Sequence, residues 1–77
     1  MELVDTLQSG EKSALIKKVG EGLYIVEYTN GELFVNAGYF STHEVAEAKV
    51  TELFNAESIS GEMLVGDVPA ELGRAHV

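Results

Sequence analysis

Histidine and cysteine carry much of the acid–base, nucleophilic and metal chemistry that proteins perform near neutral pH. This 77-residue sequence has no cysteine and two histidines, His43 and His76, which stand far apart with no second histidine at a metal-ligand spacing. His43 falls in the first turn of an expected helix, where a polar surface side chain is the ordinary occupant. We therefore expect no metal site and no cofactor.

A catalytic nucleophile needs a neighbouring base that a third group holds in place. Ser41 directly precedes the expected helix and is better explained as its cap. The segment Gly20-Glu21-Gly22 is too short for a phosphate-binding loop, and a strand follows it. Paired carboxylates stay open, although so small a chain has little room for a pocket of roughly 300 Å³ or more. We expect no catalytic residues, and a small enzyme or ligand carrier is the last-ranked hypothesis.

Carboxylates dominate the charged side chains, with 13 Asp and Glu against five Lys and Arg and a formal charge of −8. A phosphate backbone would be repelled, so we expect no direct binding of nucleic acid. Glu44, Glu47 and Glu52 share the outer side of the expected helix, and Glu57 follows its end. They form either a solvated face or a negative stripe that engages Lys and Arg of a partner protein.

Strand signals precede this helix. Residues 14–19 and 23–28 are rich in apolar, β-branched and aromatic side chains, and Asn30-Gly31 separates the second run from residues 33–35. An Asn-Gly pair between such runs predicts a hairpin with a two-residue type I′ turn. The predicted register sets Thr29 opposite Glu32, Tyr28 opposite Leu33, Val26 opposite Val35 and Tyr24 opposite Ala37.

This register gives the hairpin two different faces. The face expected to meet the helix carries Tyr24, Val26, Tyr28, Leu33, Val35 and Ala37. Leu23, Ile25 and Phe34 point the other way, with Glu27 and Asn36. Either the N-terminal segment or the region around Met63-Leu64-Val65 covers them, or they form an exposed apolar patch, which usually marks a binding or dimer surface.

The helix start is clearly marked. Ser41 and Glu44 have the spacing of a capping box, and Phe40 and Val45 have that of a hydrophobic staple. The helix is predicted over 42–56. One half of its helical wheel carries Val45, Ala46, Val50, Leu53, Phe54 and Ala56, and this half is expected to face the sheet.

The two ends of the chain carry weaker signals. Residues 1–13 hold a short edge strand at 1–5 or are loosely ordered, and residues 58–77 are loosely held or ordered by a partner. Residues 63–65 are a candidate fourth strand, and 67–72 resemble the capped start of a helical turn. We predict one α+β domain over 1–77, a meander of three or four antiparallel strands packed on one face by one amphipathic helix.

These features favour a non-catalytic protein-binding module, an inhibitor or modulator with a basic partner. The candidate contacts are Glu44, Glu47, Glu52, Ile25 and Phe34. Phage proteins that disable a host enzyme or defence complex share this size, charge and simplicity, which is an analogy of design only. The alternative is a structural subunit that forms a homodimer through the outer sheet face or an edge strand.

Neither a signal peptide nor a membrane-spanning run is expected. Met1 is followed by acidic residues rather than a basic and then an apolar region. No apolar run approaches about 20 residues. The expected location is the cytoplasm.

Overall fold

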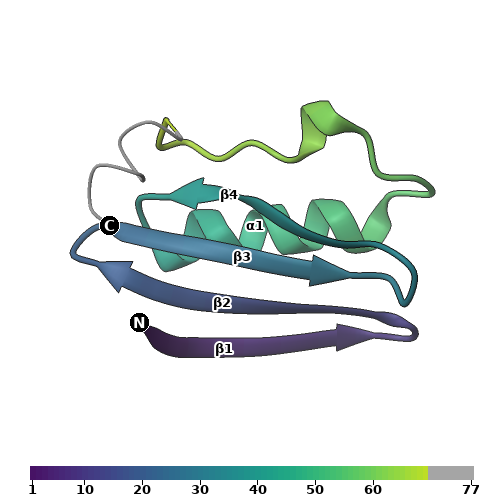
Figure 1. Ribbon diagram of the computed structural model, residues 1–77, viewed down its shortest axis with the longest axis horizontal. Coiled ribbons are helices and arrows are strands. Elements are labelled where there is room, and N and C mark those ends of the chain that lie inside the picture. Colours follow the sequence, from purple (N-terminus) through teal and green to yellow (C-terminus); the bar gives the residue numbers. More distant parts are fainter. Residues whose placement is uncertain (70–77) are drawn as a thin grey trace.

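The computed structural model describes residues 1–69, and these form one antiparallel sheet with one helix laid across one of its faces (Figure 1). The sheet order is β1-β2-β3-β4, and the elements are β1 (Glu2–Ser9), β2 (Lys12–Gly20), β3 (Leu23–Thr29), β4 (Phe34–Phe40), α1 (His43–Asn55) and the 3-10 helix η1 (Gly61–Met63). The α+β meander with one packed helix is confirmed, and it has four strands.

The core lies between α1 and the sheet. Its largest fully buried side chains are Tyr28, Phe40, Ile16, Leu53, Val26 and Val50. Phe54, near the end of α1, is partly buried and packs against this core. Each such apolar side chain contributes about 1.5–3 kcal/mol when it leaves water. The helical wheel predicted this face correctly except for Val45, which is exposed.

The fourth strand is β1, not residues 63–65. The chain turns through Gly10, whose φ of +62° favours glycine, and β1 pairs along β2 from Ser9 opposite Lys12 back to Glu2 opposite Lys18. Leu7 packs against the core beneath α1. Residues 1–13 thus include an eight-residue edge strand, longer than the short strand expected at 1–5.

The β3–β4 hairpin differs from the predicted register. Thr29 pairs with Phe34 and Tyr28 with Val35, so residues 30–33 form a four-residue loop. The side-chain Oδ1 of Asn30 accepts hydrogen bonds from the backbone N–H of Glu32 (3.0 Å) and Leu33 (2.8 Å). Within the described chain only glycines have positive φ, so Asn30 does not adopt the conformation that a type I′ turn requires.

The predicted faces survive this error because, next to the loop, the register moved by two residues and side chains alternate with a period of two. Beyond Glu27 a bulge shifts the register by one more residue, so Tyr24 pairs with Phe40 rather than Ala37. Val26, Tyr28 and Ala37 are buried, and Tyr24 and Val35 pack at the edge of the same cluster. Leu33 is the exception, since it lies in the loop and is exposed.

Of the two alternatives for the outer face of the sheet, an exposed apolar patch formed by Leu23, Ile25 and Phe34 together is not observed. Ile25, which pairs with Lys17 and Tyr39, is only 6% exposed, and Leu23 is also buried. Phe34 is 68% exposed. The prediction that Ile25 and Phe34 share an exposed surface is therefore wrong for Ile25.

The cap of α1 is Thr42 rather than Ser41. Thr42 Oγ1 accepts a hydrogen bond from the N–H of Val45 at 3.1 Å. Val45 therefore occupies the position where a capping box needs Glu or Gln, and the predicted Ser41–Glu44 box does not form. Ser41 instead donates through its backbone N–H (2.8 Å) and its hydroxyl to the carboxylate of Asp67.

The segment after α1 runs back along the free edge of β4 (Figure 1). Met63 and Leu64 pack against the helix-side core rather than the outer face. Gly66 crosses β4 so closely that a Cβ there would lie 1.7 Å from the carbonyl oxygen of Tyr39, and Val68 forms a single antiparallel bridge with Tyr39. The predicted strand at 63–65 is absent from this stretch, and the predicted helical turn at 67–72 lies partly outside the described residues.

Candidate functional site

The three helix glutamates expected to form one stripe lie in different environments. Glu52 receives a hydrogen bond and ion pair from Lys49 at 2.7 Å. Glu47 lies 3.7 Å from Nδ1 of His43. Five residues of α-helix place Glu47 and Glu52 about 140° apart around the axis, on opposite flanks of α1. Of the three, Glu44 alone is without an ion pair within residues 1–69.

All four lysines of the described residues are held by acceptors within the protein. Lys12 donates to the carbonyl oxygens of Phe54 and Ala56, both at 2.8 Å, and so satisfies the C-terminal end of α1. Lys49 donates to the Met63 carbonyl oxygen at 2.9 Å as well as to Glu52. The two others pair with carboxylates, Lys17 with Glu27 at 2.8 Å and Lys18 with Glu21 at 3.5 Å.

Many carboxylates, by contrast, make no ion pair among residues 1–69. They are Glu2, Glu11, Glu32, Glu44, Glu57 and Glu62, which are all exposed, and the exposed Asp67, which accepts hydrogen bonds from Ser41. The described surface therefore presents negative charge with little compensating positive charge.

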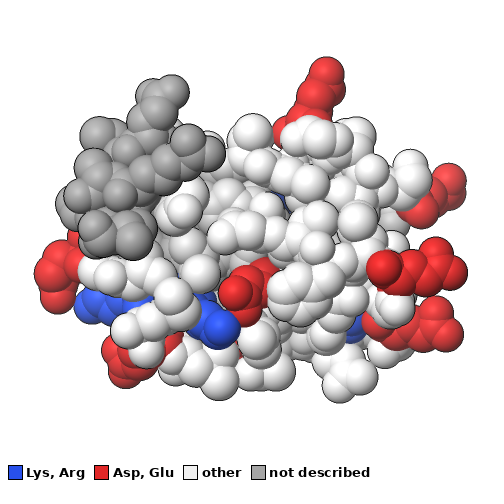
Figure 2. Space-filling view, in the orientation of Figure 1, with Lys and Arg blue, Asp and Glu red and all other residues white. Residues whose placement is uncertain are grey.

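Three of these carboxylates gather where the two hairpin loops meet the C-terminal end of α1. Glu11 and Glu32 line one shallow groove between the β1–β2 turn and the β3–β4 loop. Lys12 donates a hydrogen bond to the carbonyl oxygen of Ala56, which joins the β1–β2 turn to the end of α1. Glu11 is the sequence neighbour of Lys12 and Glu57 that of Ala56, so both glutamates lie near this contact. In Figure 2 acidic side chains project along the edge where Figure 1 places these loops. We call Glu11, Glu32 and Glu57 the acidic end; sequence reasoning missed it because only the tertiary fold joins the three segments.

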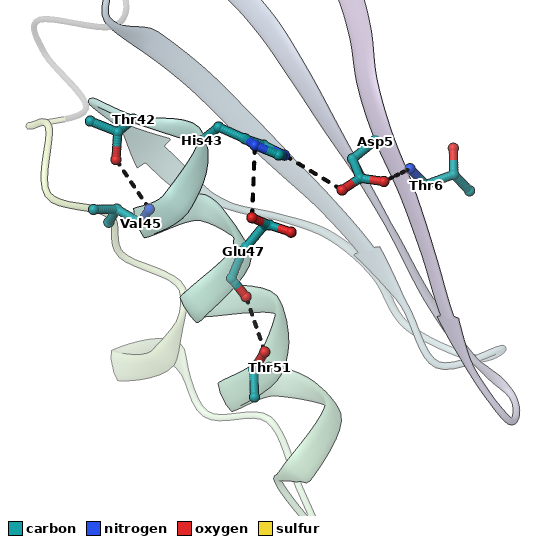
Figure 3. Close-up of polar contacts among 7 residues, drawn as sticks. All are labelled: Asp5, Thr6, Thr42, His43, Val45, Glu47 and Thr51. Atoms are coloured by element: carbon teal, nitrogen blue, oxygen red, sulfur yellow. Dashed lines mark hydrogen bonds and ion pairs between the residues drawn. The ribbon is translucent and has the colours of Figure 1, made fainter.

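A second cluster joins β1 to the first turns of α1. Nε2 of His43 lies 3.5 Å from Oδ2 of Asp5, and Nδ1 of the same ring lies 3.7 Å from Oε1 of Glu47 (Figure 3). The imidazole thus stands between two carboxylates, one on the strand and one on the helix. Its Nε2 is shielded from solvent and has no hydrogen-bond partner among residues 1–69.

A β-bulge at Val4 directs Asp5 toward the helix. Leu3 pairs with Lys17 on the outer face, whereas Asp5 pairs with Ile16, which is buried beneath α1. In a regular strand Leu3 and Asp5 would point to the same face of the sheet, because side chains alternate with a period of two. Val4 is an extra, bulged residue, so Leu3 and Asp5 point to opposite faces. The sequence carries no local signal for this bulge, so the Asp5–His43 contact could not be predicted.

This cluster is not arranged for nucleophilic catalysis. The nearby hydroxyls are engaged elsewhere, since Thr42 caps α1 and Thr51 donates to the Glu47 carbonyl oxygen at 3.2 Å (Figure 3). No serine or threonine hydroxyl within residues 1–69 hydrogen-bonds to His43. The cluster therefore lacks the nucleophile–base pair of a triad.

A cleft of about 510 Å³ lies between β4 and the segment that crosses it. Its described lining consists of Asn36, Gly38, Tyr39, Leu64, Val65, Gly66, Val68 and Pro69. No carboxylate or histidine is among them, so the cleft as described has no acid–base pair at its wall.

Comparison of the chain with protein-family models, curated proteins and solved structures finds no match. Among the described residues, no helix is long and apolar enough to cross a membrane.

Proposed function

We propose that this protein is a non-catalytic protein-binding module that engages a basic surface of its partner through the acidic end. The observation that carries the proposal is the asymmetry of the charges. All four described lysines bind acceptors inside the fold, while Glu11, Glu32 and Glu57 project from neighbouring loops without an ion pair in residues 1–69.

The small free energy of a single exposed ion pair favours a partner that binds several carboxylates at once. One exposed ion pair contributes about 0.2–1 kcal/mol. Three carboxylates on converging loops can pair with several Lys or Arg side chains, and the overall charge of −8 steers a basic partner toward them. Such binding weakens as salt rises, because exposed charges are screened.

Occupying a basic site is enough to block it, so an inhibitor or modulator is the role that we propose for such a module. A basic site that normally receives nucleic acid is one suitable target, because carboxylates compete there with phosphates for the same Lys and Arg. We propose the cytoplasm as the place of action.

The test is affinity capture on the immobilised protein with stepwise elution by salt, using two triple variants of equal charge. In the first, Glu11, Glu32 and Glu57 become Gln; in the second, Glu44, Glu47 and Glu52 become Gln. We expect a basic protein that wild type retains at low salt, and we expect the first variant to lose it and the second to keep it. Equal retention by wild type and the first variant would refute the acidic end, and loss in the second alone would place binding on the helix.

Self-association is the second proposal, and it rests on the exposed ring of Phe34. Its neighbours along the ladder are Thr29, Ser13 and Gln8, so the apolar area around it is small. The bulge at Val4 and the inward-facing Asp5 discourage pairing through the β1 edge. Light scattering at two protein concentrations and two salt levels measures the mass; a dimer that Phe34→Glu converts to monomers would support this proposal, and a monomeric wild type would exclude it.

A further inference from the structure

We propose that Asp5, His43 and Glu47 form a binding site for a divalent transition-metal cation, with Zn²⁺ as the best-matched ion. This site is separate from the acidic end, and it adds a ligand to the protein-binding function proposed above. The cluster brings one imidazole and two carboxylates together from β1 and from the first turns of α1, which are far apart in the sequence.

The donor set selects the class of ion. Zn²⁺ binds histidine nitrogen and carboxylate oxygen, and catalytic or exposed zinc sites commonly use three protein ligands with water in the remaining position. Ca²⁺ and Mg²⁺ prefer oxygen ligands alone, so an imidazole in the set disfavours both. The described lysines are all bound elsewhere, so none of them supplies the positive charge at this cluster.

The spacing fits such an ion. One ligand atom from each residue lies within 4.8 Å of the other two. Tetrahedral bonds of about 2.1 Å hold neighbouring ligand atoms roughly 3.4 Å apart. Nε2 of His43 and Oδ2 of Asp5 already stand at 3.5 Å, whereas Oε1 of Glu47 lies 3.7 Å from Nδ1, the other ring nitrogen, so the Glu47 carboxylate has to turn toward Nε2 to complete the set. The Asp5 and Glu47 side chains are 34% and 44% exposed, so their carboxylates, rather than the shielded Nε2 of His43, form the side of the cluster that is open to water.

Two further observations support a ligand here. Nε2 of His43 is shielded from solvent and finds no hydrogen-bond partner in the described residues, and buried polar atoms are normally satisfied by protein, water or an ion. The bulge at Val4 turns Asp5 toward this atom, and bulges often re-aim side chains beside functional sites.

The experiment titrates Zn²⁺ into the untagged, chelator-treated full chain and follows the heat of binding together with the NMR signals of the His43 ring. We expect one ion per chain, a shift of the His43 signals and a rise in Tm. Asp5→Asn and His43→Gln should each weaken binding by about tenfold or more. Glu44→Gln is the matched control, since it removes one carboxylate from the same helix turn, and its affinity should stay within about twofold of wild type. Ca²⁺ and Mg²⁺ should give no response.

His76→Gln separates this site from the other histidine of the sequence. Binding that His76→Gln abolishes, or that His43→Gln and Asp5→Asn leave unchanged, would overturn the proposal. So would the absence of any heat or ring shift at millimolar Zn²⁺, which would leave His43 as an ion-pair contact between β1 and α1. Thermal melts of the metal-free variants confirm that each is folded, and Asp5→Asn decides the matter if His43→Gln does not fold.

Discussion

The hydroxyl of Tyr28 offers a sharp test of the core. The ring is 0% exposed and packs beneath α1 against Phe54, with ring centroids 6.3 Å apart. Within the described part of the chain the hydroxyl oxygen has no hydrogen-bond partner. Tyr28→Phe removes this oxygen and changes nothing else in the side chain, so it isolates the cost of burying an unsatisfied polar group.

The expected magnitude follows from two opposing terms. An unsatisfied buried donor costs about 1–3 kcal/mol relative to its hydrated state. Removing the oxygen leaves a void on the order of 10 Å³. At about 24 cal/mol per Å³ this void destabilises the variant by only about 0.2 kcal/mol. We therefore expect Tyr28→Phe to raise the free energy of unfolding by about 1–2 kcal/mol near neutral pH.

The same substitution changes the response to alkali. Burial raises the pKa of Tyr28 above its ordinary value of 10.0, because the charged phenolate is poorly solvated in the core. Below about pH 10 the Tyr28 phenol is protonated in both the folded and the unfolded state, so its ionisation does not affect the free energy of unfolding. Above that value the unfolded chain loses the proton first, so wild-type stability falls by up to about 1.4 kcal/mol per pH unit until the folded pKa is reached. Tyr28→Phe lacks this decline.

The assay is urea unfolding of wild type and variant near pH 7 and near pH 11, followed by circular dichroism. The difference between the two proteins should widen between pH 7 and pH 11, because only wild type carries the Tyr28 hydroxyl, whose pKa burial raises. A variant that is less stable than wild type near pH 7 would refute the reasoning, since it would mean that the hydroxyl is satisfied, for example by a buried water.

Three further substitutions test other contacts by equilibrium unfolding. Lys12→Met removes two hydrogen bonds to the last carbonyl groups of α1 and should cost about 1–2 kcal/mol, whereas Lys18→Met removes only a surface pair and should cost less than about 0.5 kcal/mol; equal costs would contradict the capping role. Gly66→Ala places a methyl group against the Tyr39 carbonyl oxygen and should cost about 2 kcal/mol or more, while Gly61→Ala enters open space and serves as the control; a harmless Gly66→Ala would show that the crossing is not close. The hydrogen bond from the Ser41 hydroxyl is the main cause that lowers the pKa of Asp67 below its ordinary value of 3.8. The contact therefore stabilises the fold fully above pH 3.8, and this stabilisation is lost as the pH falls through the folded pKa. Acid unfolding of Asp67→Asn should lack this loss, and an acid profile equal to that of wild type would argue against the contact.

Sequence reasoning was most accurate where the signal is local. The apolar and aromatic run of β3 was predicted at 23–28 and observed at Leu23–Thr29, and the helix predicted over 42–56 is observed at His43–Asn55. Alternation with a period of two, and apolar residues recurring every three or four positions, are properties of a few neighbouring residues. They do not depend on the rest of the chain.

Errors arose where distant segments meet. β1 has a modest sequence signal and becomes a long strand because β2 offers an edge and the core accepts Leu7. Ser41 has the features of a helix cap, yet it binds Asp67, which is 26 positions away, and Thr42 takes the cap. Local patterns rank Ser41 and Thr42 almost equally, so a distant carboxylate decided between them.

The sequence by itself determined a short α+β chain, the two faces of its central hairpin, the apolar side of its helix and an excess of negative charge, because each follows from composition or from short-range periodicity. Only the tertiary structure decided which charges stand free and which are paired. It joined Glu11, Glu32 and Glu57 at one end, divided the helix glutamates between Lys49 and His43, and brought Asp5 to the imidazole through one extra residue in β1. The physical reason is that register, bulges and long-range contacts are set by how whole elements pack, and a window of neighbouring residues does not contain that information.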